Sequence, residues 1–250
     1  PKESNDLIDQ SAAYKALFDS FKKDYSTLCE YYNELAKKNI ATFEREHFPQ
    51  FIDAVDSLLK TYFWCVPANT MESTPIGSLY HHLHNSAAIS AALYAQDECK
   101  EQSEPPFMII AADLNGIQNY LYDLNPENSS KASKLLRSRS FQIQMIMEML
   151  ADKVINELGL SHLSIISSQG GKWFILANNS KENEQKLEEV KRTVNAEMFT
   201  RFLGLVSINL SWETKLGLAD LRKEHFINTM NRVYESLEKE KMNRFSAYLQ

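Results

Sequence analysis

An acid at the end of an apolar run is the first residue of this sequence that could take part in chemistry. The run that starts at Phe107 closes on Asp113, and a turn follows at Asn115-Gly116. Four to eight apolar residues bounded by turn residues predict a buried strand. An acid at the carboxyl end of such a strand lies on the rim of a sheet, where ligands usually bind. Asp113 is therefore a candidate for binding a nucleotide or a metal.

A glycine turn and a basic stretch could add contacts to an anion. The segment Ser167-Ser-Gln-Gly-Gly-Lys172 predicts a tight hairpin whose backbone amides can approach a phosphate closely. The stretch Lys131-Ala-Ser-Lys-Leu-Leu-Arg-Ser-Arg has four positive charges and no negative one at the start of a predicted helix. Helix N-termini attract anions. An ordinary turn and a solvated basic face are the simpler alternatives.

Three histidines near residue 80 have a spacing that a metal site could use. His81 and His84 are three residues apart, so they share one face of a predicted helix, and His82 lies between them. No acid or cysteine lies within a turn of them, which favours helix packing over metal binding. Cys29, Cys65 and Cys99 are far apart and form no pair, so they predict neither a zinc site nor a disulfide framework.

The first part of the chain has helical periodicity. Apolar residues recur every three or four positions over 7–38 and, after Pro49, over 51–63, and a third helix is predicted from Leu79 to Ala95. Residues 97–106 are polar and end in Pro-Pro, which predicts a linker. We therefore expect a helical region over 1–96 and a different domain from 107 onward.

The second part alternates between strand and helix patterns. Strands are predicted at 107–113, 163–167, 173–177 and 202–210, and helices at 117–124, 132–158, 182–199 and 219–250. This β-α-β-β-α-β order is that of a ferredoxin-like antiparallel sheet backed by helices on one face. The predicted fold class is α+β: a helical region, a ferredoxin-like domain over 107–218, and a long C-terminal helix.

The predicted sheet has the palm geometry of nucleotidyl cyclases and polymerases, but it lacks half of their chemistry. Two-metal catalysis needs carboxylates both at the end of the first strand and in the hairpin. Asp113 provides the first, whereas the hairpin from Ser167 to Trp173 has no acid. The sequence therefore predicts a palm that holds a ligand rather than one that catalyses nucleotidyl transfer by itself.

Charge and composition limit the classes of partner. The net charge of −6 gives no overall basic character, so nucleic-acid contact would need a local patch. No stretch approaches about 18 consecutive apolar residues and no signal pattern opens the chain, so we expect a soluble, cytoplasmic protein with no membrane partner. The chain begins with Pro1 rather than Met, and we expect it to be a piece of a longer protein.

Five blocks of the sequence together resemble one known family. They start, in order, at Leu59 (LKTYFWCVPANT), Ser78 (SLYHHLHNSAAI), Asp113 (DLNGIQNYLY), Lys131 (KASKLLRSRSF) and Ser167 (SSQGGKW). The family is the large subunit of type III CRISPR effector complexes, and the blocks are closest to the III-A form. The resemblance covers roughly residues 55–212.

The resemblance implies a nuclease and cyclase parent. Such proteins combine an HD-type single-strand DNase domain, a first palm, a zinc-binding segment, a second palm with a Gly-Gly-Asp-Asp motif and a helical domain. They make cyclic oligoadenylates from ATP, with Mg or Mn, when target RNA is bound. This chain would match part of the HD region and the first palm. It has no His-Asp dipeptide and no Gly-Gly-Asp-Asp, so whether it is itself an enzyme is uncertain. It also has His81, Asn115 and Ser138 where the family has Asp, Ser and Gly.

The leading hypothesis is an antiviral CRISPR subunit whose first palm binds ATP for a reaction on another palm. The expected partners are other effector subunits, crRNA, target RNA and single-stranded DNA. The expected ligand-binding residues are Asp113, Asn115, Gly116, Gln118, Ser168, Gly170 and Gly171, and Lys134, Arg137 and Arg139 are expected to contact phosphate or RNA. The alternatives are a purely structural palm, a degenerate diguanylate-cyclase-like domain and, as the weakest, a metal nuclease built on His81, His82 and His84.

Overall fold

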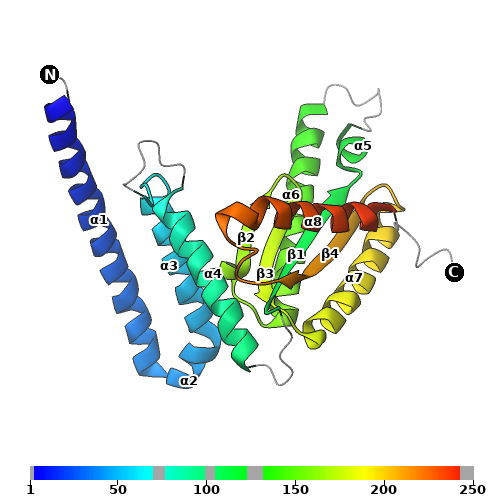
Figure 1. The fold of residues 1–250 in the computed structure, drawn as a ribbon, viewed down its shortest axis with the longest axis horizontal. Helices are drawn as coiled ribbons and strands as arrows, with labels where there is room; N and C mark the ends of the chain where they lie inside the picture. Colours follow the sequence, from blue (N-terminus) through cyan, green and yellow to red (C-terminus); the bar gives the residue numbers. More distant parts are fainter. Residues whose placement is uncertain (1–2, 70–76, 99–104, 123–131, 243–250) are drawn as a thin grey trace. The chain divides into compact units, whose positions relative to one another are not determined.

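The computed structural model describes residues 3–69, 77–98, 105–122 and 132–242 (Figure 1). The chain divides into two compact units, Pro1–Ser86 and Ala87–Gln250, and each is described by itself. The predicted linker at 97–106 lies mostly outside the described residues and stays a prediction. None of the described helices is both long and apolar enough to cross a membrane.

The first unit, which we call the N-terminal unit, is helical, as predicted. It contains α1 (Glu3–Lys38), α2 (Ile40–Thr42), η1 (Phe43–His47), α3 (Phe48–Phe63) and the start of α4 (Leu79–Glu98). Pro49 lies in the first turn of α3, where its missing N–H is tolerated. Aromatic contacts join α1 to α3, because the ring of Phe21 packs on those of Tyr62 and Phe63.

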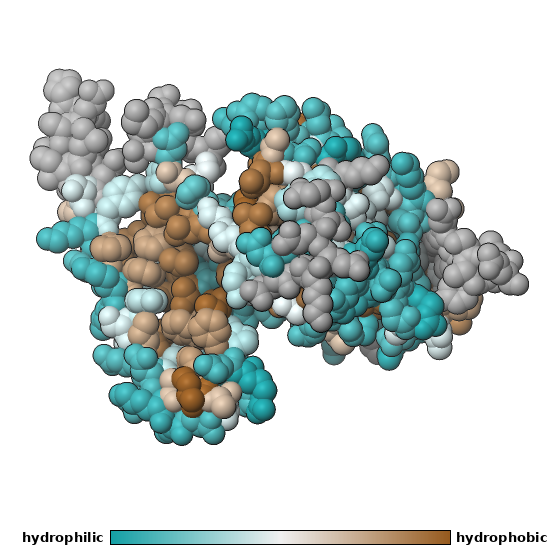
Figure 2. All heavy atoms as spheres, turned by 60° about the horizontal axis from the view of Figure 1, so that its bottom comes forward, coloured by the Kyte–Doolittle hydropathy of each residue, from teal (hydrophilic) through white to brown (hydrophobic). Residues whose placement is uncertain are grey.

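The N-terminal unit has a small core. Phe63 and Tyr80 are the buried hydrophobic residues among its described side chains. Figure 2 shows hydrophobic residues gathered on the surface of these helices. The exposed large side chains include Tyr14, Phe18, Tyr31, Phe48 and Trp64. Since apolar burial is the main favourable term in folding, this unit gains much less from burial than the second unit does.

The second unit, which we call the palm unit, is built on a four-stranded antiparallel sheet. Its strands are β1 (Phe107–Asn115), β2 (Ile165–Gln169), β3 (Lys172–Asn178) and β4 (Ser207–Leu216), in the spatial order β2-β3-β1-β4. The strand order and the helices between the strands confirm the predicted ferredoxin-like α+β fold.

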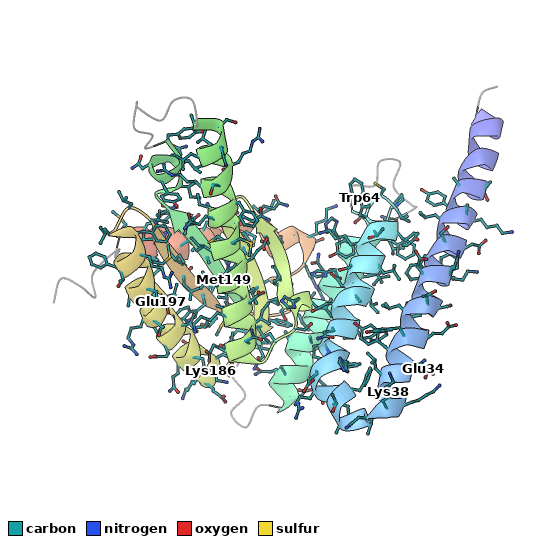
Figure 3. The ribbon with its side chains drawn as sticks, turned by 180° about the vertical axis from the view of Figure 1, so that it is seen from behind. Glu34, Lys38, Trp64, Met149, Lys186 and Glu197 are labelled. Atoms are coloured by element: carbon teal, nitrogen blue, oxygen red, sulfur yellow. The ribbon has the colours of Figure 1, made fainter. Side chains whose placement is uncertain are left out.

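Helices cover both faces of this sheet. Alternate residues of β1 point to opposite faces, so Met108 and Ile110 pack with α6 (Ala132–Leu158) and α7 (Lys181–Phe202). Phe107 and Ile109 pack with α8 (Lys223–Met242) and with residues of α4. Figure 1 shows α8 running across the sheet, and Figure 3, drawn from behind, shows α6 and α7 on the other side.

The expectation of one covered face was therefore wrong. Every residue of β1 from Phe107 to Leu114 is buried. A strand that is apolar on both of its faces needs a covering layer on each. The same apolar run that predicted the strand thus also required α8.

The start of β4 differs from the prediction. The sequence predicted a strand over 202–210, whereas α7 continues to Phe202 and β4 begins at Ser207. Phe202 extends the inward-facing series of α7 by one further turn and packs on the core below that helix. Leu203 then ends the helix in a left-handed conformation, with φ 49°.

Two other boundaries shift by a few residues. The second strand starts at Ile165 rather than at 163, because Ser161 caps a 3₁₀ turn, η3 (His162–Ser164), ahead of it. The C-terminal helix starts at Lys223 rather than at 219, because Asp220 accepts a hydrogen bond from the backbone of Gly217 in a preceding turn. The bounds of α6 are as predicted.

Candidate functional site

Asp113 lies near the end of β1, between two neighbouring strands. It is directly opposite Lys172 of β3 and Asn209 of β4. Its side chain shares the sheet face of Phe107 and Ile109, since these residues alternate along the strand. Asp113 is only 5% exposed, so its carboxylate needs close partners.

Two lysines provide those partners. Lys241 of α8 and Lys172 of β3 place their Nζ atoms 3.1 Å and 3.7 Å from Oδ2 of Asp113. Lys241 also contacts Glu238 at 2.5 Å, and the Nζ of Lys172 lies 5.6 Å from the ring centre of Tyr234. The hydrogen bonds to Glu238 and then to Asp113 raise the pKa of Lys241, while burial opposes that shift. Asp113 is therefore neutralised by two cations.

This arrangement does not suit a divalent cation. A metal would have to displace two ammonium groups from Asp113, and the facing hairpin has no second carboxylate. Across the described ranges no cluster of three His, Cys, Asp or Glu side chains could hold a metal ion. The residues present thus fit a nucleotide's polar groups better than they fit a catalytic metal pair.

Two glycines allow close approaches at the end of β1. Gly116 has φ +83°, and a Cβ atom there would lie 2.0 Å from the backbone oxygen of Leu205. Gly171 has φ +84°, and its Cβ would lie 2.7 Å from Cδ1 of Ile117. The carbonyl of Gly171 also accepts a hydrogen bond from the amide of Leu114 at 3.0 Å. Both positions therefore require glycine. Gly116 lets the turn after β1 approach the backbone just before β4, and Gly171 lets the hairpin approach the start of α5.

The other predicted ligand-binding residues are more exposed. Asn115 is half-buried at the strand end, whereas Gln118 and Ser168 are exposed, and a Cβ atom on Gly170 would meet nothing within 4 Å. Among the described residues, none of these side chains forms a hydrogen bond with Asp113. Their ligand role stays a prediction.

The basic stretch divides into two parts. Lys134 and Arg137 are exposed on α6 and are available to an anion. Arg139 instead donates a 2.6 Å hydrogen bond to the backbone carbonyl of Tyr120, and its guanidinium group lies over the aromatic ring of the same residue. It therefore caps the end of α5 (Ile117–Tyr122), which gives it a structural role besides the predicted phosphate contact. Lys131 lies outside the described residues.

The histidines belong to local networks in the N-terminal unit. The Ser78 hydroxyl lies 2.7 Å from His81 Nδ1, and His82 is exposed. His84 Nδ1 lies 2.8 Å from Asp56 Oδ1, and the Tyr80 hydroxyl donates to the other oxygen of Asp56 at 3.1 Å. Burial, followed by the charge of Asp56, raises the pKa of Tyr80 to about 12. We call Asp56, Tyr80 and His84 the α3–α4 polar cluster.

Three polar residues of β4 were not predicted as site residues. Ser207, Asn209 and Ser211 are each no more than 5% exposed. Both serine hydroxyls and the Nδ2 atom of Asn209 are buried without a hydrogen-bond partner among the described residues. The signal was present, because polar and apolar residues alternate from Ser207 to Trp212 as in a strand with one polar face. We call these three residues the β4 polar cluster.

Comparison with known proteins identifies the family. The sequence profile described as Csm1 subunit domain B matches residues 106–250. The chain is 26% identical over 205 residues to the "CRISPR system single-strand-specific deoxyribonuclease Cas10/Csm1 (subtype III-A)" of Thermococcus onnurineus, covering 77% of this chain and 26% of the relative. Its counterpart in Streptococcus thermophilus is 28% identical over 216 residues, with 79% and 27% covered. This chain thus spans about a quarter of the length of these curated relatives.

Solved structures agree with this assignment. The Csm1–Csm4 subcomplex of the type III-A CRISPR-Csm interference complex matches with a TM-score of 0.69 and 25% identity, over 89% of this chain and 30% of that one. A Csm1–Csm4 cassette in complex with AMPPNP matches with a TM-score of 0.68 and 25% identity, over 90% and 30%. Because the profile covers more than half of the residues, the chain belongs to the Csm1 domain B family and so to the Cas10/Csm1 large subunits of type III-A CRISPR systems.

Proposed function

We propose that the palm unit binds ATP and presents it to a second palm for cyclic oligoadenylate synthesis. Family membership gives the chain its role in a type III CRISPR large subunit. That this palm unit binds ATP goes beyond family membership. It is supported by the similar Csm1–Csm4 structures, which were determined with one ATP and with AMPPNP.

One observation carries this proposal: the glycine hairpin is held directly against the end of β1. Gly171 makes that approach, since its carbonyl accepts a hydrogen bond from the amide of Leu114, and the Nζ of Lys172, the next residue, lies 3.7 Å from Oδ2 of Asp113. Backbone amides of a glycine turn beside a lysine are well suited to a phosphate group. Asp113 can accept a hydrogen bond from a sugar or base. The site can thus bind a nucleotide without performing chemistry on it.

Catalysis is assigned elsewhere because Asp113 is the one carboxylate at this strand end and hairpin, and no cluster of three metal-ligating side chains occurs among the described residues. Lys172 and Lys241 both contact Oδ2 of Asp113, which leaves Oδ1 to accept a hydrogen bond but makes the carboxylate a poor general base or metal ligand. ATP would bring its own divalent ion, and the second palm would supply the carboxylates that two-metal transfer needs.

The wider role includes assembly with nucleic acid and protein. The similar solved structures contain Csm1 together with Csm4. Lys134 and Arg137 form an exposed basic surface on α6 that suits crRNA, target RNA or single-stranded DNA. The N-terminal unit would be the end of an HD-like region. We expect the assembled complex to act in the cytoplasm.

A structural scaffold is the second candidate function. The observation that favours it is the neutralisation of Asp113 by Lys172 and Lys241. A palm whose acid is permanently paired would only shape the complex. Substituting Asp113→Ala in the assembled effector complex separates the two functions. Intact assembly with lost oligoadenylate synthesis supports nucleotide binding, and unchanged assembly and synthesis support the scaffold.

Isothermal titration of the full chain with ATP and Mg²⁺ tests nucleotide binding directly. We expect Lys172→Met to weaken ATP binding about tenfold, because a charge-assisted contact to phosphate is lost. Lys186→Met, on α7, is the matched control, because the side chain of Lys186 is as exposed as that of Lys172 (37% against 38%) and also pairs with an acid; it should bind ATP as the wild type does. Absence of heat from the wild type, with and without a separately produced Gly-Gly-Asp-Asp palm, would contradict the proposal.

A further inference from the structure

The sheet face that α8 covers has two chemically different halves. One half is apolar, where Val233 and Leu237 of α8 pack in one cluster with Phe174 and Leu216. The other half is polar and surrounds the end of β1. There Asn209 lies opposite Asp113, Ser207 opposite Asn115, and Ser211 opposite Ala111. Both halves are buried, although only the first has a matching apolar partner.

The polar half is poorly matched to its cover. The β4 polar cluster contains three buried atoms with no hydrogen-bond partner among the described residues. Burial of such an atom is unfavourable, because it loses its hydrogen bonds to water and gains none from the protein. Lys241, one turn beyond Leu237, reaches over this half and contacts Asp113 at 3.1 Å. The neighbouring Glu240 pairs with Lys191 of α7 at 2.7 Å. The end of α8 is therefore held by two ion pairs over groups that it leaves unsatisfied, and the pair of Lys241 with Asp113 is the one that lies on the polar half.

We propose that the β4 polar cluster is a wall of the nucleotide site, and that the last turns of α8 cover this wall until Lys241 releases Asp113. This inference rests on the proposed ATP-binding function and adds its regulation. When α8 lifts, Asn209, Ser207 and Ser211 offer amide and hydroxyl groups at the position where Asp113 and the hairpin meet. The apolar part of α8, with Val233 and Leu237, stays packed on the sheet, and the end of the helix moves relative to it.

The chemistry of the exposed wall fits a nucleoside. An amide and two hydroxyls can donate to and accept from a base edge or a ribose, and the carboxylate of Asp113 can accept from a ribose hydroxyl or an exocyclic amine. Lys172 remains beside the hairpin for phosphate. The unpaired atoms are thus satisfied by the ligand instead of by the protein, which favours the open state when nucleotide is present.

Thiol labelling measures whether α8 opens. A Ser211→Cys reporter would be placed in a chain whose Cys29, Cys65 and Cys99 are replaced by serine, and its reaction with iodoacetamide followed by mass spectrometry. Adding Lys241→Met should speed labelling about tenfold, because one charge-assisted contact no longer holds the helix closed. The matched control is Lys239→Met, an exposed lysine two residues away on the same helix, which should leave the rate unchanged.

A second reporter separates local opening from global unfolding. Val154→Cys is fully buried on the α6 side of the sheet and should label at the same slow rate in all variants. If Ser211→Cys is labelled at the same rate with and without Lys241→Met, the proposal that the Lys241–Asp113 contact keeps α8 closed is overturned. Faster labelling of both reporters would also overturn it, because the variant would then be unfolding the whole unit.

ATP titration connects the cover to the ligand. Lys241→Met should tighten ATP binding by up to about tenfold, since the cost of opening is removed, whereas Asn209→Ala should weaken it. Equal affinity in wild type, Lys241→Met and Asn209→Ala would overturn this inference and leave the proposed ATP binding in place. If Lys241→Met speeds the labelling of Ser211→Cys but no variant binds ATP, then α8 does cover the β4 polar cluster, and the proposed nucleotide binding is rejected.

Discussion

Two polar clusters in this chain, one partly buried and one fully buried, differ in whether their polar atoms have partners. In the α3–α4 polar cluster, both oxygens of Asp56 have partners, Tyr80 on one and His84 on the other. In the β4 polar cluster, Ser207, Asn209 and Ser211 each have a buried atom with none among the described residues. The first cluster joins two helices, α3 and α4, and the second lies on the strand β4.

The difference indicates which cluster is structural and which awaits a ligand. A fully paired polar cluster repays the cost of its burial and fixes the helices that carry it. A cluster with unpaired polar atoms lowers the stability of the fold. If it served packing alone, alanine in place of serine would remove that penalty with a single change. Buried polar atoms without partners therefore point to function more strongly than buried polar residues in general.

Breaking the paired cluster should have the largest effect. Asp56→Ala leaves the Tyr80 hydroxyl and a ring nitrogen of His84 without their shared acceptor, and we expect a loss of about 2–3 kcal/mol in the local stability of α3 and α4. Hydrogen exchange of peptides from these helices, read by mass spectrometry, measures it. Ser57→Ala, at the next and exposed position of α3, should change little. A loss below about 0.5 kcal/mol would show that the cluster is not structural.

Tyr80→Phe should have a smaller and pH-dependent effect. The pKa of Tyr80 is raised to about 12 in the folded wild type. The stability that the protonated Tyr80 hydroxyl contributes is therefore complete below pH 10 and is lost as the pH rises toward 12. At pH 8 the variant should lose about 1 kcal/mol by giving up the hydrogen bond to Asp56. Near pH 12 the difference from the wild type should disappear.

Urea unfolding followed by circular dichroism at pH 8 and at pH 11 to 12 measures this difference. Tyr94→Phe is the control, because that side chain is 69% exposed. A constant difference between wild type and Tyr80→Phe across this pH range would contradict the role assigned to the Tyr80 hydroxyl.

Removing the unpaired hydroxyls should have the smallest effect, of the opposite sign. The double change Ser207→Ala and Ser211→Ala deletes two buried unpaired groups, so we expect unchanged or slightly higher stability of the palm unit, by up to about 1 kcal/mol. Thermal unfolding measures the shift. A loss of more than about 1 kcal/mol would mean that these hydroxyls already have partners in the folded chain, and the comparison between the two clusters would fail.

Much of the fold followed from local patterns. The bounds of α6 and the core of β1 were predicted because long periodic segments and apolar runs are strong local signals. The strand order followed from the order of elements, since few sheet topologies connect them. The start of β4 was missed because Phe202 suits either a helix face or a strand, and only its packing on the core decides.

The site was predicted less completely. Asp113, Gly116 and Gly171 were identified because an acid after a strand and glycine turns are visible in the sequence, although their ligand role awaits a test. Lys241 was not, because it lies 128 positions from Asp113 in the chain and meets it only through the crossing of α8. Arg139 was predicted as a phosphate contact, and its bond to Tyr120 could not be foreseen from charge alone.

The sequence alone determined that a strand ends on Asp113, that a glycine hairpin without acids faces it, and that the family is that of a CRISPR large subunit. Those features are local, because residue type and spacing fix them. Only the tertiary structure decided that Asp113 is neutralised by two lysines and that unpaired polar groups lie beneath α8. Pairing and burial depend on which distant elements meet, and no local pattern encodes that.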